Sequence, residues 1–383
     1  MGFTWHCWRK IITNKILMLK NIFSILLLLV GIHIHAQIPS GYYNSASGSG
    51  YTLKSQLKTI IDNVNDNNGQ SFHDINVTYS QLWNLFENSD VRDDGKVWDV
   101  YSNCDFVFGE VEDGGDQDNG SGGNSECDKF NREHTFPQSW YDDGSHPMKA
   151  DAFHVLPSDK KVNSIRGNLA FSEVDVPNYT SQNGSKRGTS SIVGPTSNVF
   201  EPVDEFKGDI ARGFFYVATR YEDEIGTWEN NDSNGDSMLD GSGDKVFETW
   251  AIQMLYNWHI NDPVSQKEID RNNVIFNHQN NRNPFIDHPE YVQNIWGTVL
   301  SEKNYSLDKK TSIYPNPATE NYIYVRSNEQ VTVKIFSLLG KKLIQNIIEP
   351  SNNKMDISII KSGVYIIKIS NNSSSITRKF IKK

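Results

Sequence analysis

The sequence predicts an α+β fold in which a mainly helical domain with a strand–strand–helix core is followed by a small all-β sandwich domain. Three observations lead to this prediction. Apolar residues recur at helical spacing in several segments, a strand–strand–helix pattern rich in polar residues occupies residues 130–168, and short β segments separated by turn residues begin near residue 313. At 383 residues, of which 37% are hydrophobic, the chain is long enough for more than one globular domain.

The first residues of the chain have the features of an export signal. Lysines precede the apolar run 22–34, and Ala36 is small enough to precede a cleavage site. This run is too short to cross a bilayer as a helix. We therefore expect a signal peptide over residues 1–36, with Met18 as an alternative start, and no stable membrane span in the mature protein.

The segments with helical periodicity lie within residues 37–302, which we expect to form one domain. The expected helices cover residues 51–66, 80–88, 207–221 and 247–261, and a further helix follows the Asp262-Pro263 pair. Residues 97–107 alternate and are rich in aromatic and β-branched residues, which predicts a strand.

A strand–strand–helix core is expected in the middle of this domain. Residues 130–136 are typical of a strand that ends at a proline, and residues 151–156 form a second extended segment. A turn follows, where Ser158 or Asp159 can cap a helix that runs through Arg166. Side chains on the first strand and on the helix then face a common centre from two rigid elements.

The residue types in this core indicate a particular chemistry. The carboxylate of Glu133 and the carboxamide of Asn163 are hard oxygen ligands suited to Mg²⁺ or Mn²⁺. The neutral imidazole of His134 can take a proton from water near pH 7. With Arg166 as a cation, these groups are sufficient to hydrolyse a phosphodiester. For an isolated Glu-His pair, strand alternation would place the two side chains on opposite faces, with one of them a plain surface residue.

The charge distribution sets a condition on this interpretation. Residues 37–302 contain 19 Lys and Arg against 42 Asp and Glu, whereas residues 303–383 are basic and the whole chain has a formal charge of −10. An acidic surface disfavours non-specific binding of nucleic acid, which depends on neutralising phosphates. A nuclease built on this domain therefore needs a local basic groove and a metal ion.

Two cysteines, Cys104 and Cys127, remain after removal of the signal peptide. In an exported protein we expect them to form one disulfide. The alternative is a zinc site formed by these two cysteines and two of His134, His146 and His154, although zinc sites rich in sulfur usually pair cysteines at shorter spacing.

The chain changes character after a polar linker expected over residues 303–311. Residues 312–383 contain short β segments separated by turn signals at the spacing of a sandwich. This part carries no cluster of acids and bases, so we expect catalysis to lie in the preceding domain.

With these motifs in view, residues 37–300 resemble the secreted bacterial endonuclease I family, which has a ββα-metal active site. The resemblance rests on segments in the same order along the chain: NREHTFPQSW, DAFHVLPSDKKVNSIRGNLAFSEV, FEPVDEFKGDIARGFFYVATRY, and DPVSQKEIDRNN followed by NRNPFIDHPEY. It implies an endonuclease that cuts DNA, with RNA as a further substrate, to 5′-phosphate products. The implied cofactor is Mg²⁺, with Mn²⁺ or Ca²⁺ as alternatives.

The resemblance also implies roles for individual residues. Glu133 and Asn163 match the metal ligands, His134 matches the general base, and Arg166 matches a basic position with a catalytic contact to phosphate. Positions that match the motifs with a role in substrate binding or in support are Asp151, His154 and Asn168. Some members carry a further catalytic Arg between the two motifs, and residues 141–148 contain none.

The last residues resemble another known module. The segments IYPNPATENYIYV, SGVYIIKI and TRKFIKK are similar to the C-terminal sorting domain of the type IX secretion system. This implies the type IX machinery as a partner, export through the periplasm, and a secreted or cell-surface location.

Two other functions remain open from the sequence. A metal-dependent phosphoesterase of another substrate would use the same residue types, whereas a zinc protease is disfavoured because the chain lacks an HExxH pair. A non-catalytic calcium-binding or adhesion module would use the acidic loops and the β domain.

Overall fold

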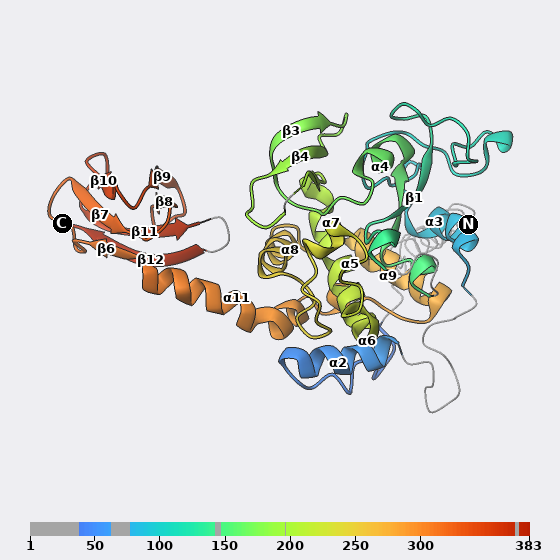
Figure 1. Cartoon of the computed structure of the whole chain (residues 1–383), viewed down its shortest axis with the longest axis horizontal. Coiled ribbons are helices and arrows are strands. Elements are labelled where there is room, and N and C mark those ends of the chain that lie inside the picture. Colours follow the sequence, from blue (N-terminus) through green and yellow to red (C-terminus); the bar gives the residue numbers. More distant parts are fainter. Residues whose placement is uncertain (1–37, 63–76, 142–146, 196, 372–374) are drawn as a thin grey trace, which may run out of the picture. The chain divides into compact units, whose positions relative to one another are not determined.

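The computed structural model describes residues 38–62, 77–141, 147–195, 197–371 and 375–383. The signal peptide expected over residues 1–36 lies outside this part of the chain. The described residues confirm the α+β class, with a mostly helical part that contains small sheets and an all-β C-terminal part (Figure 1). Within the described ranges, no helix is both long and apolar enough to cross a membrane.

The first part is built mainly from helices. These are α2 (Gly50–Ile61), α3 (Leu82–Ser89), α4 (Lys160–Arg166), α5 (Lys207–Arg220), α6 (Glu222–Ile225), α7 (Ser233–Asp236), α8 (Thr249–Asn261), α9 (Gln266–Gln279), α10 (Pro284–Asp287) and α11 (Glu290–Lys310). Short 3₁₀ helices are η1 (Tyr79–Gln81), η2 (Val111–Asp113), η3 (Gln138–Trp140), η4 (Met148–Ala150) and η5 (Asp204–Phe206). Helix α11 includes residues 303–310, which we expected to form a linker.

Two small antiparallel sheets accompany these helices. Strands β1 (Phe130–His134) and β2 (Val155–Asp159) pair with Glu133 opposite Leu156 and His134 opposite Val155. The second sheet, which the sequence analysis did not predict, has the order β3 (Val174–Thr180), β4 (Lys186–Ser190), β5 (Val199–Glu201).

The strand expected over residues 97–107 is absent. The segment folds back on itself instead, because the Val97 amide donates a hydrogen bond to the Phe106 carbonyl (3.0 Å). Most of its apolar side chains are still buried, among them Val97, Tyr101 and Phe106. The alternation of residue types therefore reflects burial of a loop rather than an extended strand.

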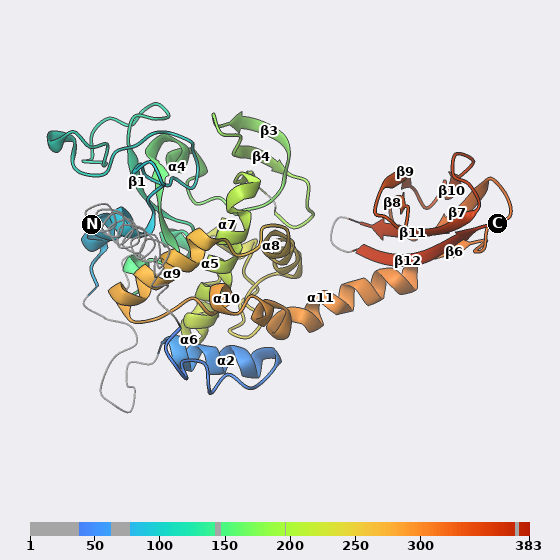
Figure 2. The ribbon, with the colours of Figure 1, turned by 180° about the vertical axis from the view of Figure 1, so that it is seen from behind.

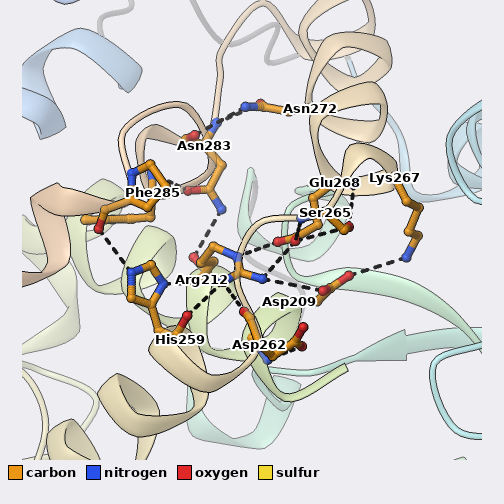
Figure 3. A network of polar contacts seen from close by, with 12 residues as sticks. Asp209, Arg212, His259, Asp262, Ser265, Lys267, Glu268, Asn272, Asn283 and Phe285 are labelled. Atoms are coloured by element: carbon orange, nitrogen blue, oxygen red, sulfur yellow. Dashed lines mark hydrogen bonds and ion pairs between the residues drawn. The ribbon is translucent and has the colours of Figure 1, made fainter. Parts of the chain in front are cut away.

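Helix α5 is the centre of the helical part (Figure 2). Every residue of this helix except Asp209 is buried, and its apolar side chains belong to the main hydrophobic core. Figure 3 shows how Arg212 joins α5 to α9: its Nε and one terminal nitrogen donate to the two carboxylate oxygens of Glu268 at 2.5 and 2.8 Å. Such a paired geometry fixes both distance and orientation between helices.

Helix α9 in turn holds the start of strand β2, in the β1–β2 sheet. The guanidinium of Arg271 donates to the carboxylate of Asp90 (2.8 Å) and to the backbone carbonyls of Ala152 and Val155 (2.8 and 3.0 Å). Because α9 is anchored to the core through Arg212, strand β2 begins at a fixed position.

The C-terminal part is an all-β unit of two sheets. The strands are β6 (Ser312–Tyr314), β7 (Tyr322–Arg326), β8 (Val331–Phe336), β9 (Lys342–Ile348), β10 (Lys354–Asp356), β11 (Gly363–Ser370) and β12 (Ser375–Lys382). One sheet has the order β10-β7-β6 and the other β12-β11-β8-β9. Alternate residues of β8 are buried, and they share one hydrophobic core with the other strands, as the period-two pattern predicted.

Candidate active site

Strand β1 separates the two residues on which the predicted chemistry depends. Glu133 and His134 are adjacent, so strand alternation directs their side chains to opposite faces. On one face Glu133 contacts Tyr101 and Arg166. On the other face His134 contacts the ring of Tyr79. Neither residue is a plain surface residue, because both are buried.

The Glu133 carboxylate is held through one of its two oxygens. Its Oε1 accepts a hydrogen bond from the Tyr101 hydroxyl (2.7 Å) and lies 3.0 Å from the Arg166 guanidinium. Its Oε2 has no hydrogen-bond partner among the described residues. Burial raises the pKa of this carboxyl to about 6, although the charge of Arg166 and the bond from Tyr101 oppose that shift.

Arg166, at the C-terminal end of α4, is buried with 1% of its surface exposed. Its guanidinium donates to the backbone carbonyls of His134 (3.0 Å) and Thr135 (2.6 Å), at the end of β1, and pairs with Glu133. The side chain that the sequence analysis expected to contact phosphate thus faces the strand that it holds. Its contacts fix both the backbone and one carboxylate of the site.

Helix α4 begins directly at the end of β2. The Asp159 carboxylate accepts from the amides of Lys161 (2.8 Å) and Val162 (3.0 Å), so Asp159 is the residue that caps the helix. One turn later, the Asn163 amide donates to the Asn131 side-chain oxygen of β1 at 2.9 Å. This bond uses the nitrogen of the carboxamide and leaves its oxygen without a hydrogen-bond partner among the described residues.

The imidazole of His134 has a defined orientation. Its Nε2 lies 3.0 Å from the backbone carbonyl of Lys149, and its Nδ1 lies 3.3 Å from the side-chain amide nitrogen of Gln138. A carbonyl can only accept, so Nε2 carries the proton and Nδ1 presents a lone pair. Burial, with the neighbouring His154 ring as the next cause, lowers the pKa of His134 to about 3. The ring is therefore neutral at ordinary pH.

Two further rings enclose this imidazole. The Tyr79 ring, from η1, stacks on it with a centroid distance of 5.3 Å and an interplanar angle of 28°. The His154 ring lies 5.6 Å away and is fully buried, with its Nε2 2.7 Å from the Met148 carbonyl. His154 therefore packs beneath His134 and does not reach solvent.

Asp151 is the centre of a buried network rather than part of the site surface. Its carboxylate accepts from the Arg220 guanidinium (2.6 Å), from the hydroxyls of Tyr216 (2.9 Å) and Tyr221 (2.8 Å), and from the Gln279 amide (2.8 Å). These partners come from α5, the residue that follows it, and α9. They anchor the residue that directly follows η4, the short helix that supplies the Lys149 carbonyl to His134.

Asn168 lies after α4 and is engaged in a separate set of contacts. Its amide nitrogen donates to the Asp232 carboxylate (2.6 Å), and its backbone carbonyl accepts from the Trp140 indole (3.2 Å). These bonds connect three loops. None of the contacts found for Asn168 among the described residues reaches Glu133 or His134.

The cysteine prediction is confirmed. Cys104 and Cys127 form a disulfide, with their Cα atoms 5.2 Å apart. Both sulfurs are used in that bond, so the zinc alternative fails, and His146 lies outside the described residues. The Cys127 amide also donates to the Asp159 carboxylate (2.7 Å), which joins the disulfide loop to the cap of α4.

Sequence analysis missed three groups that shape the site. Tyr101 reaches Glu133 from a segment expected to be a strand, and Tyr79 covers His134 from a short 3₁₀ helix. The third is a backbone atom, the Lys149 carbonyl. The first two contacts span more than 30 residues and the third involves no side chain, so no local pattern could have indicated them. Gln138, four residues after His134, was the one partner within reach of a local argument.

Comparison with known proteins identifies both parts of the chain. Residues 312–383 match the model of a secretion system C-terminal sorting domain, which confirms the expected type IX module and a secreted or cell-surface location. Residues 49–290 match the model of the endonuclease I family.

Two bacterial proteins are similar to the first part. An extracellular ribonuclease of Bacillus amyloliquefaciens is 34% identical over 260 residues, which cover 67% of this chain and 78% of that protein. An extracellular ribonuclease of Bacillus subtilis (strain 168) is 35% identical over 266 residues, with the same shares of the two chains. Because the family match covers more than half of the chain and encloses the strand–strand–helix site, this protein belongs to the endonuclease I family, whose members hydrolyse phosphodiester bonds of nucleic acids.

Proposed function

We propose that this protein is a secreted, metal-dependent endonuclease without sequence specificity, which hydrolyses phosphodiester bonds of DNA, and also of RNA, to 5′-phosphate products. In this proposal His134 is the general base, and a divalent ion is held by Glu133 and Asn163. Mg²⁺ is the preferred ion, with Mn²⁺ or Ca²⁺ as alternatives.

The observation that carries the proposal is the state of the His134 imidazole. Its Nε2–H is directed to the Lys149 carbonyl, so the lone pair lies on Nδ1, and the lowered pKa keeps this nitrogen unprotonated at neutral pH. A water molecule that binds at Nδ1 can therefore give up its proton to this nitrogen as it attacks phosphorus. The Gln138 amide donates a long hydrogen bond (3.3 Å) to Nδ1, and a water that binds there would replace this donor.

The residues on the other face of β1 fit a divalent ion. Glu133 Oε2 and Asn163 Oδ1 are hard oxygen donors without hydrogen-bond partners among the described residues, whereas the remaining polar atoms of both side chains are engaged. A bound ion would supply positive charge to the phosphate and to the leaving 3′ oxygen. Glu133, with its pKa near 6, would be held as the carboxylate by such a charge.

Other predicted site residues have positioning roles in this proposal. Arg166 holds the end of β1 and the orientation of Glu133, and we assign it that role in place of a phosphate contact. Asp151 anchors the C-terminal end of η4, which supplies the Lys149 carbonyl, His154 supports the His134 ring, and Asn168 connects the neighbouring loops. Each of these contacts lies within the protein and none requires substrate.

The substrate class follows from the family and from its relatives. Both similar Bacillus proteins are named ribonucleases, which supports RNA as a substrate beside DNA.

The proposal is tested by incubating the full-length protein with supercoiled plasmid and with a structureless RNA, each with Mg²⁺ and with EDTA. We expect nicking and then degradation of both substrates that require the ion, and 5′-phosphate ends that a phosphatase removes. Cleavage of a chromogenic phosphate ester without cleavage of nucleic acid would favour a phosphoesterase of another substrate. Absence of any hydrolysis would contradict the proposal.

A further inference from the structure

Two cations near His134 lack the carboxylate partner that most described lysines and arginines of this domain have. In this acidic domain most described lysines and arginines lie within 4.0 Å of a carboxylate, as do Lys160 and Arg166 beside the same site. Arg132 and Lys149 have no such partner among the described residues. Both charges act on one imidazole, because each of them lowers the pKa of His134.

Arg132 is held rigidly although it has no counter-ion. Its guanidinium carbon lies 3.6 Å from the centroid of the Tyr79 ring and 4.4 Å from that of the Trp83 ring. One terminal nitrogen donates to the Tyr79 carbonyl at 2.6 Å. The guanidinium also makes a hydrogen bond with the Tyr79 side chain. A cation stacked on aromatic rings in this way keeps its planar set of donors in one orientation.

Arg132 and His134 are on the same face of β1, because they are two residues apart on a strand. Tyr79 connects them: its ring stacks on His134 and also on Arg132. The ammonium group of Lys149 lies 5.9 Å from the centroid of the same ring. One tyrosine thus brings a planar cation and a flexible cation to the side of the imidazole.

We propose that Arg132 and Lys149 form a subsite that binds a backbone phosphate of the nucleic acid beside His134. This proposal rests on the proposed function and deepens it. Arg132 offers paired N–H donors that match two phosphate oxygens, and Lys149 adds a point charge. The backbone carbonyl of Lys149 also fixes the His134 ring. Lys149 would therefore position the base through its backbone and the substrate phosphate through its side chain. The subsite provides the local basic surface that an acidic domain needs to bind nucleic acid.

The test measures binding separately from cleavage. The full-length protein carrying His134→Ala, which removes the base, is titrated with a short fluorescein-labelled oligothymidylate in Mg²⁺, and fluorescence anisotropy is recorded over a series of KCl concentrations. On this background Arg132→Gln and Lys149→Gln should each weaken binding about tenfold, as expected for loss of one phosphate contact. Each should also reduce the slope of log affinity against log salt concentration by about 0.7, the value per contact for single strands.

Lys96→Gln is the matched control, because Lys96 also has no carboxylate partner among the described residues and does not act on the pKa of His134. It should leave affinity and slope unchanged. Unchanged affinity and slope in Lys149→Gln, with a native circular dichroism spectrum, would overturn the subsite even if Arg132→Gln fails to fold. Failure of the proposed function is a different result, because it appears as absence of cleavage by the protein with His134 intact.

Discussion

The two faces of strand β1 shift the pKa values of an acid and a base in opposite directions. On the face of Glu133, a carboxylate lies beside a buried guanidinium and a tyrosine hydroxyl. On the face of His134, an imidazole lies beside an aromatic ring and a backbone carbonyl. Burial disfavours the charged form of both groups, so it raises the pKa of the acid to about 6 and lowers that of the base to about 3.

This difference shows how adjacent residues can serve two functions. The Glu133 face offers the oxygen donors that we propose to hold an ion, with one oxygen of Glu133 already paired with Arg166. The His134 face provides a neutral lone pair and is suited to take a proton. If this division is correct, substitutions on one face should affect ion binding and stability, and substitutions on the other should affect the rate of the chemical step.

The largest effect is expected from Arg166→Met. This change leaves the buried carboxylate of Glu133 without its cation and two backbone carbonyls of β1 without their donor. Loss of one partner from a buried ion pair costs about 3–5 kcal/mol of unfolding free energy. Urea unfolding measures this loss of unfolding free energy. Arg92→Met, in a partly exposed pair with Asp94, should cost no more than about 1 kcal/mol. Equal losses in the two variants would contradict the assigned role.

Asn163→Ala should act mainly on ion binding. Loss of a ligand should weaken affinity for Mn²⁺ by at least about tenfold, since even the partners of ligands contribute 10- to 100-fold. Calorimetric titration gives the affinity, and the cleavage rate should recover largely at saturating ion. Ser164→Ala, at an exposed neighbouring position, is the control. An unchanged affinity in Asn163→Ala would remove this residue from the ion site.

The pH dependence of stability should distinguish the two faces. Because the pKa of His134 falls from 6.5 to about 3 on folding, the unfolded state binds more protons in that interval, and stability decreases as pH falls. Glu133 has a raised pKa, so its contribution is present at low pH and is lost as pH rises from 4.5 to about 6. His134→Ala should therefore make the loss of stability on acidification shallower, and Glu133→Gln should make it steeper.

Each change in slope is at most about 1.4 kcal/mol per pH unit, the value for one proton. Urea unfolding in EDTA at a series of pH values between 6.5 and 4.5 measures both variants under the same conditions. Slopes that change in the same direction would show that the two residues do not have opposite environments.

The smallest effect is expected from Gln138→Leu. Its amide approaches the His134 Nδ1 at 3.3 Å, a long contact between neutral groups. Loss of such a bond costs about 0.5–1.5 kcal/mol, so cleavage should slow by no more than about tenfold. Single-turnover cleavage measures the rate. A much larger loss would indicate that the amide contacts the phosphate directly.

The first strand and the helix of the core could be predicted because their signals are local, whereas the second strand is β2 (Val155–Asp159) and not residues 151–156, and the expected turn after it lies within the strand. Alternation, a proline after the first strand, and Asp159 as a helix cap lie within one short stretch of chain. Helix α5 was likewise predicted from its apolar spacing. Helix α9 was expected to follow a cap at Asp262-Pro263, whereas Ser265 caps it, in a capping box with Glu268.

What could not be predicted depends on contacts between distant segments. The role of Arg166 is an example: from sequence it was a candidate phosphate contact, and only the fold shows that its guanidinium faces the end of β1. The stack of Tyr79 on Arg132 and His134 also joins residues more than 50 positions apart. The strand predicted from the alternation of residues 97–107 was wrong, because a buried loop and a strand can share the same pattern.

The most direct test of the account is the single-turnover rate of DNA cleavage by His134→Ala at saturating Mg²⁺, with Mn²⁺ affinity measured on the same sample. Loss of a general base should slow cleavage on the order of 10²–10⁴-fold. The ion affinity should remain near that of the unmodified protein, and added imidazole should restore part of the rate. A rate that is unchanged, or one lost together with ion binding, would contradict the assignment of base and ion to separate faces of β1.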